Sequence, residues 1–214
     1  MIVSDSQSAR LRAAAIISAG GIVAFRTDTF YGLGADPFNK EALASLKELK
    51  GREAGKPILV IISDPKQAER FIAERSELFE QVCQRHWPGP LTIVVRARSA
   101  VPVELTAGTE TIGVRLPDDE GVREFVRACG GALTATSANV AGEPPARTAQ
   151  EVADSFPAGL GLIIDGGSAQ SDQPSTVLDL SGREPRLIRE GALSKPVLDE
   201  TFASLGKQLS SPAE

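Results

Sequence analysis

Several residue types that common functional sites depend on are scarce in this chain. Its 214 residues include one histidine, one methionine, one tryptophan, one tyrosine and two cysteines. A single histidine, His86, excludes metal sites built from several histidines, and it sits at a predicted helix end where it packs or caps. No HExxH, GxSxG or paired-cysteine zinc spacing is present. The thiols of Cys83 and Cys129 have no CxxC spacing, which indicates buried, unpaired side chains in a reducing compartment.

Long apolar runs and an excess of positive charge are also absent. The uncharged stretch 13–25 is too short to span a bilayer, and two glycines divide it into a helix end and a strand. We therefore expect a cytoplasmic protein without membrane contact. The net charge is −5 and the pI about 5.1, whereas a protein that binds nucleic acid over its whole surface is usually basic. Any contact with RNA must therefore be local or indirect.

The remaining composition is that of an ordinary globular protein, with 42% apolar and 24% charged residues. Helical and strand patterns are mixed along the whole length, without a repeat, a linker or strict βαβ order. The predicted fold class is α/β, with a twisted mixed sheet flanked by helices. We expect a single domain over residues 1–206 and a frayed tail over 207–214.

Local patterns give the expected elements. Buried apolar runs predict strands at 22–25, 58–62, 91–95, 112–116, 132–135, 160–164, 176–180 and 186–188. Helical spacing and capping residues predict helices at 8–19, 39–50, 65–72, 76–86, 118–128, a short one from 148, and 194–205. In this prediction Asn39, Ser76, Asp118 and Thr148 are the N-caps, and Glu151 completes a capping box with Thr148.

Polar clusters follow several of the predicted strands. Thr27, Asp28 and Thr29 follow the first strand, the segment 136–139 (Thr-Ser-Ala-Asn) follows another, and Arg189 ends a third. In open α/β sheets, ligands bind beyond the carboxyl ends of the strands. Hydroxyl and amide groups beside Lys and Arg suit an anionic ligand, which predicts a phosphate-handling site. The alternative for each hydroxyl cluster is an ordinary turn or helix cap.

A basic loop follows the helix that ends at Lys50. Residues 51–57 superficially resemble a P-loop, but three residues instead of four separate the glycines, and a proline replaces the magnesium-binding Ser or Thr. Lys50, Arg52 and Lys56 therefore fit either a different phosphate clamp or a solvated basic turn. Arg115 lies in an apolar strand, where an unpaired charge would be costly. It either forms a buried ion pair or faces a ligand.

Taken together, an ordered set of segments resembles the YrdC-like family of threonylcarbamoyl-AMP synthases. The segments are 27–34, 50–52 with 56–57, 87–92, 113–117, 136–139 and 174–177. The resemblance implies a twisted α/β sheet with a concave, locally basic cavity, in the short single-domain form. It implies synthesis of threonylcarbamoyl-AMP and pyrophosphate from L-threonine, bicarbonate or CO₂, and ATP. Mg²⁺ would be carried with ATP, without a protein-bound metal. tRNA-threonylcarbamoyl transferase proteins would act downstream, and weak tRNA contact is allowed.

The resemblance also carries residue roles onto this sequence. The family's polar quartet, expected to be catalytic, corresponds to Lys50, Arg52, Ser137 and Asn139. The residues expected to face ATP are Arg52, Lys56, Thr111, Asn139, Arg147 and Arg189. Those expected to face threonine or its carbamate are Thr29, Arg115, Ser137 and Ser175. This chain departs from many members at Arg26, where they have proline, and from some members at Ile61, where they have histidine.

Two other functions remain open from the sequence. A non-catalytic RNA-binding module could use a concave basic face, although no RNP motif, RGG segment or aromatic stacking array is present. A related enzyme could make a carbamoyl adenylate of a different amine. RNA affinity without nucleotide turnover would favour the first alternative, and substrate competition would identify the second.

Overall fold

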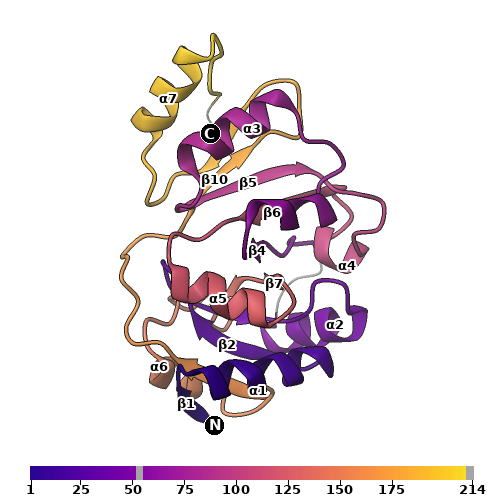
Figure 1. Ribbon diagram of the computed structural model, residues 1–214, viewed down its shortest axis with the longest axis vertical. Coiled ribbons are helices and arrows are strands. Elements are labelled where there is room, and N and C mark those ends of the chain that lie inside the picture. Colours follow the sequence, from indigo (N-terminus) through magenta and orange to yellow (C-terminus); the bar gives the residue numbers. More distant parts are fainter. Residues whose placement is uncertain (52–54, 211–214) are drawn as a thin grey trace.

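The computed structural model describes residues 1–51 and 55–210, and its strands form two mixed sheets (Figure 1). The five-stranded sheet has the spatial order β1 (Ile2–Ser4), β9 (Leu162–Asp165), β2 (Val23–Arg26), β3 (Tyr31–Gly34), β8 (Thr136–Ser137). The six-stranded sheet has the order β11 (Arg186–Arg189), β10 (Thr176–Asp179), β5 (Leu91–Arg96), β6 (Thr111–Arg115), β4 (Val60–Ile62), β7 (Ala132–Thr134). Parallel and antiparallel pairs occur in both sheets, which confirms the predicted mixed α/β class.

The helices cover the two sheets from different sides (Figure 1). They are α1 (Gln7–Ser18), α2 (Lys40–Leu49), α3 (Glu77–His86), α4 (Val103–Thr106), α5 (Glu120–Ala128), α6 (Ala149–Ser155), α7 (Lys195–Ser204) and the 3₁₀ helix η1 (Pro65–Arg70). The predicted caps Asn39, Ser76 and Thr148 each accept a backbone N–H from the first helical turn. Within the described ranges, no helix is both long and apolar enough to cross a membrane.

The predicted cap of α5 is wrong by one residue. The Asp119 carboxylate, and not that of Asp118, accepts the backbone N–H of Val122 at 3.1 Å. The side chain of Asp118 is instead 72% exposed, and its backbone N–H donates to Asp28. The second oxygen of Asp119 accepts from Arg26 Nη2 at 2.7 Å. This ion pair fixes the end of β2 against the start of α5.

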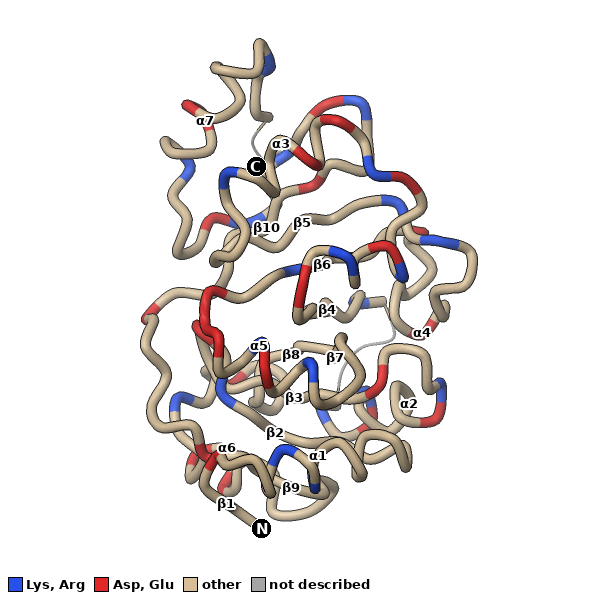
Figure 2. Tube along the Cα trace, in the orientation of Figure 1, with Lys and Arg blue, Asp and Glu red and all other residues tan. Residues whose placement is uncertain are grey.

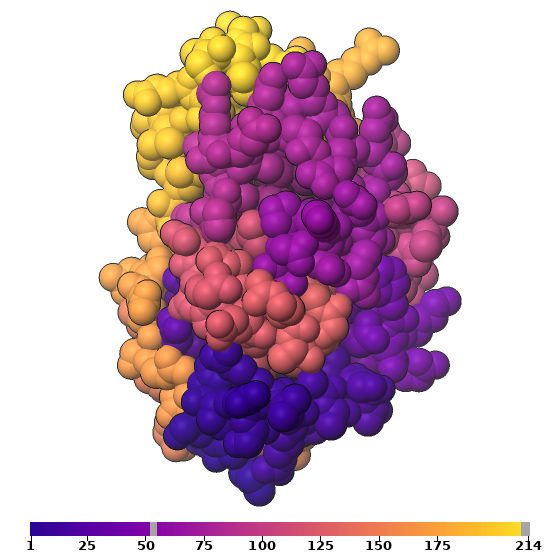
Figure 3. Space-filling model, in the orientation of Figure 1, coloured from indigo at the N-terminus to yellow at the C-terminus, as the bar shows by residue number. Residues whose placement is uncertain are grey.

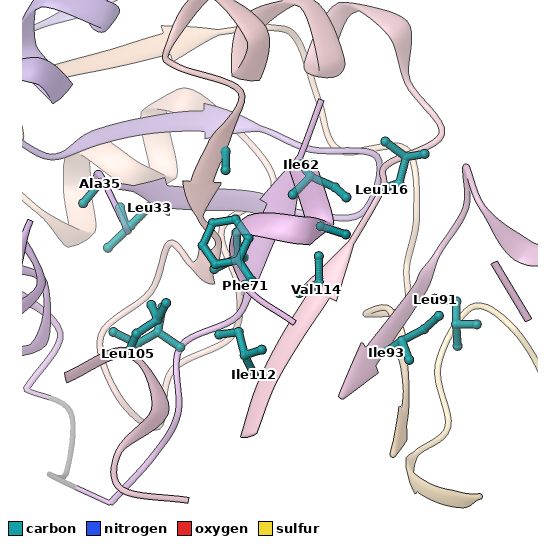
Figure 4. Packing of buried hydrophobic residues seen from close by; sticks show 14 of the residues in the cluster. Leu33, Ala35, Ile62, Phe71, Leu91, Ile93, Leu105, Ile112, Val114 and Leu116 are labelled. Atoms are coloured by element: carbon teal, nitrogen blue, oxygen red, sulfur yellow. The ribbon is translucent and has the colours of Figure 1, made fainter. Parts of the chain in front are cut away.

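Two apolar clusters hold the layers together. In the first, helices α1 and α5 pack on the five-stranded sheet, and the rings of Phe25 and Phe125 lie 4.9 Å apart. The second, larger cluster joins the six-stranded sheet to η1, α3 and α4, and Phe71 lies between side chains of β4 and β6 (Figure 4). Cys83 and Cys129 are buried and unpaired in these clusters, as predicted. In the space-filling view, α5 fills the front surface between α1 and the chain that leads to α3 (Figure 3).

The chain passes from one sheet to the other between β7 and β8, which only Ala135 separates. Thr134, on β7, is fully buried, and its hydroxyl donates to the carbonyl of Leu33 at 3.3 Å. The same hydroxyl accepts the N–H of Ala35 at 2.8 Å. One threonine therefore connects the last strand of the six-stranded sheet to β3 of the five-stranded sheet.

Some elements differ from the sequence prediction. The segment predicted as a helix at 65–72 is the 3₁₀ helix η1, and the strands β1, β3 and β8 and helix α4 were not predicted. Of the expected tail 207–214, residues 211–214 lie outside the described ranges. Ser210 forms a bridge to Arg186, in which its N–H donates to the carbonyl of Pro185 and its carbonyl accepts from Leu187.

Candidate functional site

A cavity of about 580 Å³ lies between the facing parts of the two sheets, within the size range of small-molecule sites. From the five-stranded sheet and its turns it is lined by Thr27, Thr29, Phe30, Tyr31, Gly32, Thr136 and Ser137. From the six-stranded sheet and adjoining segments it is lined by Leu59, Ile61, Thr92, Arg115, Ala135, Ser175 and Arg189. Pro145, Asp172 and Pro174 complete the lining.

Strand alternation explains which side chains of β6 reach the cavity. Ile112 and Val114 point into the apolar core, so Gly113 and Arg115 face the opposite side. A side chain at Gly113 would start 2.4 Å from Leu59 Cδ2, and Leu59 lines the cavity. Glycine at this position therefore lets Leu59, a lining residue, pack directly against β6.

The turn after β2 is both a local turn and part of the cavity wall. Thr27 Oγ1 donates to the carbonyl of Phe30 at 2.7 Å and accepts the N–H of Thr29. Because the single hydroxyl proton of Thr27 is used in this way, the 3.1 Å contact between the two threonine hydroxyls requires Thr29 to donate. Thr29 Oγ1 then has lone pairs left for Arg115, whose Nη1 lies 3.3 Å away.

Arg115 forms a buried ion pair and also faces the cavity. Its Nη2 donates to Asp28 Oδ2, and the side chains of the pair are 6% and 10% exposed. Its Nε donates to the carbonyl of Gly89 at 3.1 Å. Burial lowers the pKa of Arg115, and the negative charge of Asp28 opposes this shift. With Thr29 also bonded, three of the five guanidinium N–H groups have protein partners, which leaves two for a ligand.

A second guanidinium approaches the cavity from β11. Arg189 Nη2 donates to the carbonyl of Ser175 at 2.8 Å, and Ser175 Oγ lies 2.9 Å from Thr92 Oγ1. Partial burial lowers the pKa of Arg189, and the nearby charge of Arg115 lowers it further. Two like charges held near each other favour an anion between them. Asp172 is the one acidic residue in the described lining, and basic and acidic residues are interspersed along the chain (Figure 2).

Lys50 and Asn139 lie behind the cavity wall. Lys50 is buried, and its ammonium donates to Thr136 Oγ1 at 3.1 Å, Asn139 Oδ1 at 3.3 Å, and both the carbonyl and the hydroxyl of Ser137. Asn139 Nδ2 donates to the carbonyls of Val140 and Glu143. Neither Lys50 nor Asn139 is among the residues that line the cavity.

The structure brings together some of the predicted site residues and not others. All four residues expected at threonine line the cavity: Thr29, Arg115, Ser137 and Ser175. Of those expected at ATP, Arg189 lines it, whereas Thr111 lies at the far end of β6, bonded to Thr109 at 2.9 Å. Arg147 bonds to Asp172 at 2.7 Å, Lys56 is exposed, and Arg52 lies outside the described residues.

Sequence reasoning missed other parts of the site. Asp28 was not expected as the partner of Arg115, and Thr92 was not expected beside Ser175. Thr92 carried a usable signal, because it is a polar residue in the otherwise apolar strand 91–95. Within residues 1–51 and 55–210, no group of three or more His, Cys, Asp or Glu side chains is arranged to hold a metal ion.

Fold and cavity together define a class: a mixed α/β domain with a cavity of small-molecule size, lined by two arginines, between two sheets. A family model named Sua5_yciO_yrdC, with the description "telomere recombination", matches residues 15–191. The chain therefore belongs to the Sua5/YciO/YrdC family.

Individual relatives agree with this membership. The chain is 36% identical over 193 residues to a threonylcarbamoyl-AMP synthase of Pyrococcus abyssi, covering 90% of this chain and 57% of that protein. It is 39% identical to the synthase of Thiobacillus denitrificans, covering 78% and 88%. The crystal structure of P. abyssi Sua5 complexed with L-threonine has a TM-score of 0.91 and 33% identity, covering 98% of this chain and 62% of that one. The chain thus spans well under two thirds of the Pyrococcus protein.

Proposed function

We propose that this chain is a nucleotidyltransferase that makes threonylcarbamoyl-AMP and pyrophosphate from L-threonine, CO₂ or bicarbonate, and ATP. The observation that carries the proposal is the convergence of Thr29, Arg115, Ser137 and Ser175 on one cavity. These residues come from four separate parts of the chain, and the family resemblance implies that all four face threonine or its carbamate. The relatives named threonylcarbamoyl-AMP synthase, and the threonine complex of P. abyssi Sua5, support the same activity.

In this proposal, Arg115 binds the carboxylate of threonine at one end of the cavity. Two of its N–H groups are left for a ligand, which matches the two oxygens of an amino-acid carboxylate. The hydroxyls of Ser137 and Ser175 are placed to accept from, or donate to, the rest of the substrate. The partner Asp28 holds the guanidinium in place, so binding threonine requires little reorganisation of that side chain.

The reaction follows from these groups as an adenylyl transfer. The uncharged amine of threonine adds to CO₂ and gives up a proton, which forms a carbamate. A carbamate oxygen attacks the α-phosphorus of ATP in line, the bond to the bridging oxygen breaks, and pyrophosphate leaves. Such transfers need mainly positioning and charge stabilisation, which Arg189 and Arg115 would supply. Mg²⁺ would arrive with the phosphates of ATP and neutralise part of their charge.

The ATP contacts of the proposal extend beyond the cavity. Lys56, Thr111 and Arg147 do not line it, so ATP would have to reach outward from Arg189 to meet them. The quartet Lys50, Arg52, Ser137 and Asn139 remains part of the proposal, with Ser137 as its substrate-contacting member. Ser137 lines the cavity.

The proposed product also implies a partner. A mixed anhydride of a carbamate and AMP is labile, so a second protein must take up the threonylcarbamoyl group promptly. We propose tRNA-threonylcarbamoyl transferase proteins in that role. An RNA-binding module is less well supported, because a cavity of about 580 Å³ fits small molecules and the charged residues of the chain are of mixed sign.

Pyrophosphate release tests the proposed function directly. Purified protein is incubated with ATP, Mg²⁺ and bicarbonate, with and without L-threonine. We expect release that requires both threonine and bicarbonate, with AMP recovered as the adenylate decays. Release with another amine in place of threonine would indicate the related carbamoyl-adenylate enzyme. No release from folded protein under any combination would contradict the proposal.

A further inference from the structure

Strand β8 forms one wall of the cavity and is held by few bonds of its own. It consists of Thr136 and Ser137, and it pairs with β3, in the register Ser137 opposite Gly32 and Thr136 opposite Leu33. It is the last strand of the five-stranded sheet, and within residues 1–51 and 55–210 no strand pairs with its other edge. A two-residue edge strand is marginal without further support.

Lys50 supplies that support from the end of α2. Its ammonium donates to side-chain or backbone oxygens of Thr136, Ser137 and Asn139, which span both residues of β8 and the turn that follows. The backbone makes the same connection, because the N–H of Ala141 donates to the carbonyl of Lys50 at 3.3 Å. These four oxygens all belong to the protein, and they lie around an ammonium that has three protons to donate.

Asn139 continues the arrangement into the next turn. Its Oδ1 accepts from Lys50 at 3.3 Å, and its Nδ2 donates to the carbonyls of Val140 and Glu143. Each end of the amide therefore has a protein partner, and the residue is 9% exposed. Asn139 thus closes the turn from 139 to 143 and also serves as an acceptor for Lys50.

We propose that Lys50 and Asn139 are positioning residues, which hold Thr136 and Ser137 in the cavity wall without contacting substrate. The identity of the ligand rests on the proposed function, whereas the positioning itself does not. In this arrangement Lys50 affects the threonine site through β8, and its charge is directed at oxygens of the protein instead of the phosphates of ATP. Of the quartet, Ser137 is then the contact residue and Lys50 and Asn139 place it, while Arg52 lies outside the described residues.

Replacing Lys50 by methionine tests the proposal, with Lys40→Met as the matched control on the exposed first turn of α2. Two affinities are measured by calorimetry: that of L-threonine, and that of a non-hydrolysable ATP analogue with Mg²⁺. For Lys50→Met we expect the Kd for threonine to rise at least about tenfold, the scale of one lost charge-assisted contact, while the Kd for the analogue stays within about twofold. Lys40→Met should change neither value.

Amide hydrogen exchange gives a second readout that does not depend on turnover. In Lys50→Met the amides of 136–141 should exchange faster than in the unsubstituted protein, because β8 and the following turn lose their support. A double-mutant cycle with Ser137→Ala should be non-additive in threonine affinity, since Lys50 acts through Ser137. Faster exchange at 136–141 in Lys50→Met, with exchange in Lys40→Met unchanged, would support the positioning role even if the protein releases no pyrophosphate. Failure of the proposed function can therefore be distinguished from failure of the positioning proposal.

Lys50→Arg distinguishes geometry from charge, and it carries the test if Lys50→Met does not fold. A planar guanidinium keeps the positive charge but cannot converge on these oxygens as a compact ammonium does. If Lys50 is a positioning residue, Lys50→Arg should bind threonine as weakly as Lys50→Met does. Its amides at 136–141 should also exchange faster than in the unsubstituted protein. Loss of affinity for the ATP analogue in Lys50→Met, with normal threonine binding and unchanged exchange, would overturn the proposal. Full rescue by arginine would overturn it as well.

Discussion

Arg115 combines a buried ion pair with a place in the cavity lining. The apolar strand around it suggested either a buried ion pair or a ligand contact, and the structure has the ion pair at the edge of the cavity. Both roles are compatible because a guanidinium has five N–H groups, of which Asp28, Thr29 and Gly89 use three. Asp28 itself could not be identified from the sequence, because the pairing joins residues 87 positions apart.

Arg115→Lys should weaken threonine binding selectively. Lysine keeps the charge but cannot form a fork with a carboxylate, and it cannot serve Asp28, Thr29 and Gly89 at once. We expect the KM for threonine to rise at least about tenfold, equivalent to ~1.4 kcal/mol of binding, with a smaller change in the KM for ATP. Steady-state pyrophosphate release measures both constants. Arg96→Lys, at an exposed position of β5, is the control, and an unchanged KM for threonine in Arg115→Lys would refute the role.

At the scale of elements, Gly191 controls how closely the chain after β11 approaches β10. A side chain there would start 2.2 Å from the carbonyl oxygen of Pro174 and 2.8 Å from the backbone carbon of Ser175. Backbone atoms cannot move aside as a flexible side chain can, so alanine must displace one of the two segments. The N–H of Gly191 also donates to Thr176 Oγ1 at 3.0 Å, and this bond would be strained.

Gly191→Ala should therefore affect both stability and the threonine site. Overpacking of this kind costs about 1–3 kcal/mol, which corresponds to a fall in Tm of about 2–4 °C for each kcal/mol in a chain of this size. Because Ser175 lines the cavity, the KM for threonine should rise as well. Thermal unfolding and kinetics check the two effects. Gly182→Ala is the control, since its nearest neighbouring atom would be 4.0 Å away, and equal behaviour of the two variants would contradict this account.

The sequence predicted elements well where local chemistry decides them. Ser76 and Asn39 start α3 and α2 as expected, because a cap needs only its own helical turn. Strand β3 was missed because its glycines weaken the strand pattern. Gly34 is required by tertiary packing, since a side chain there would meet the ring of Phe25 at 2.7 Å. Strand β8 was not predicted, because two residues leave no periodicity to detect.

At the scale of the whole molecule, His86 links α3 to the C-terminal helix α7. Its Nε2 lies 2.9 Å from Thr201 Oγ1, and Thr201 donates its own proton to the carbonyl of Val197. His86 must therefore donate through Nε2. Arg85 reinforces the junction by donating to the carbonyl of Thr201 at 3.2 Å. Burial lowers the pKa of His86, and the positive charge of Arg85 lowers it further.

Because the pKa of His86 is lowered in the folded protein, the free energy of unfolding depends on pH in a predictable direction. Below the ordinary histidine pKa of about 6.5, the unfolded chain binds a proton that the folded chain takes up only at lower pH. The contribution is therefore fully present above about pH 6.5 and is lost as pH falls through the folded pKa, with a slope of at most about 1.4 kcal/mol per pH unit. Unfolding of the protein and of His86→Gln between pH 7.5 and 5 measures it. The glutamine variant should show the smaller loss on acidification; identical slopes would exclude His86 as the cause.

The division of the strands between two sheets was beyond sequence reasoning. Mixed strand directions could be predicted from neighbouring strands such as 91–95 and 112–116, but the assignment of each strand to a sheet depends on pairings distant in sequence. The cavity also depends on strand pairings between residues distant in sequence. The residues expected at threonine were named through family resemblance, whereas their convergence on one cavity depends on which strands pair, as when β4 joins β6 and β7.

The single-residue crossing at Ala135 has a consequence for cooperativity. Two sheets could in principle melt as separate calorimetric units, as the halves of a two-domain protein often do. Here the strands on either side of Ala135, β7 and β8, belong to different sheets. The hydroxyl of Thr134 also joins the two sheets, because it bonds to Leu33 and Ala35 at β3. Loss of either sheet would break the anchor of the other, so the sheets should unfold in one transition whose calorimetric and van't Hoff enthalpies agree. Ala135 also lines the cavity, so a ligand bound there would raise the unfolding temperature of both sheets together, in the same transition.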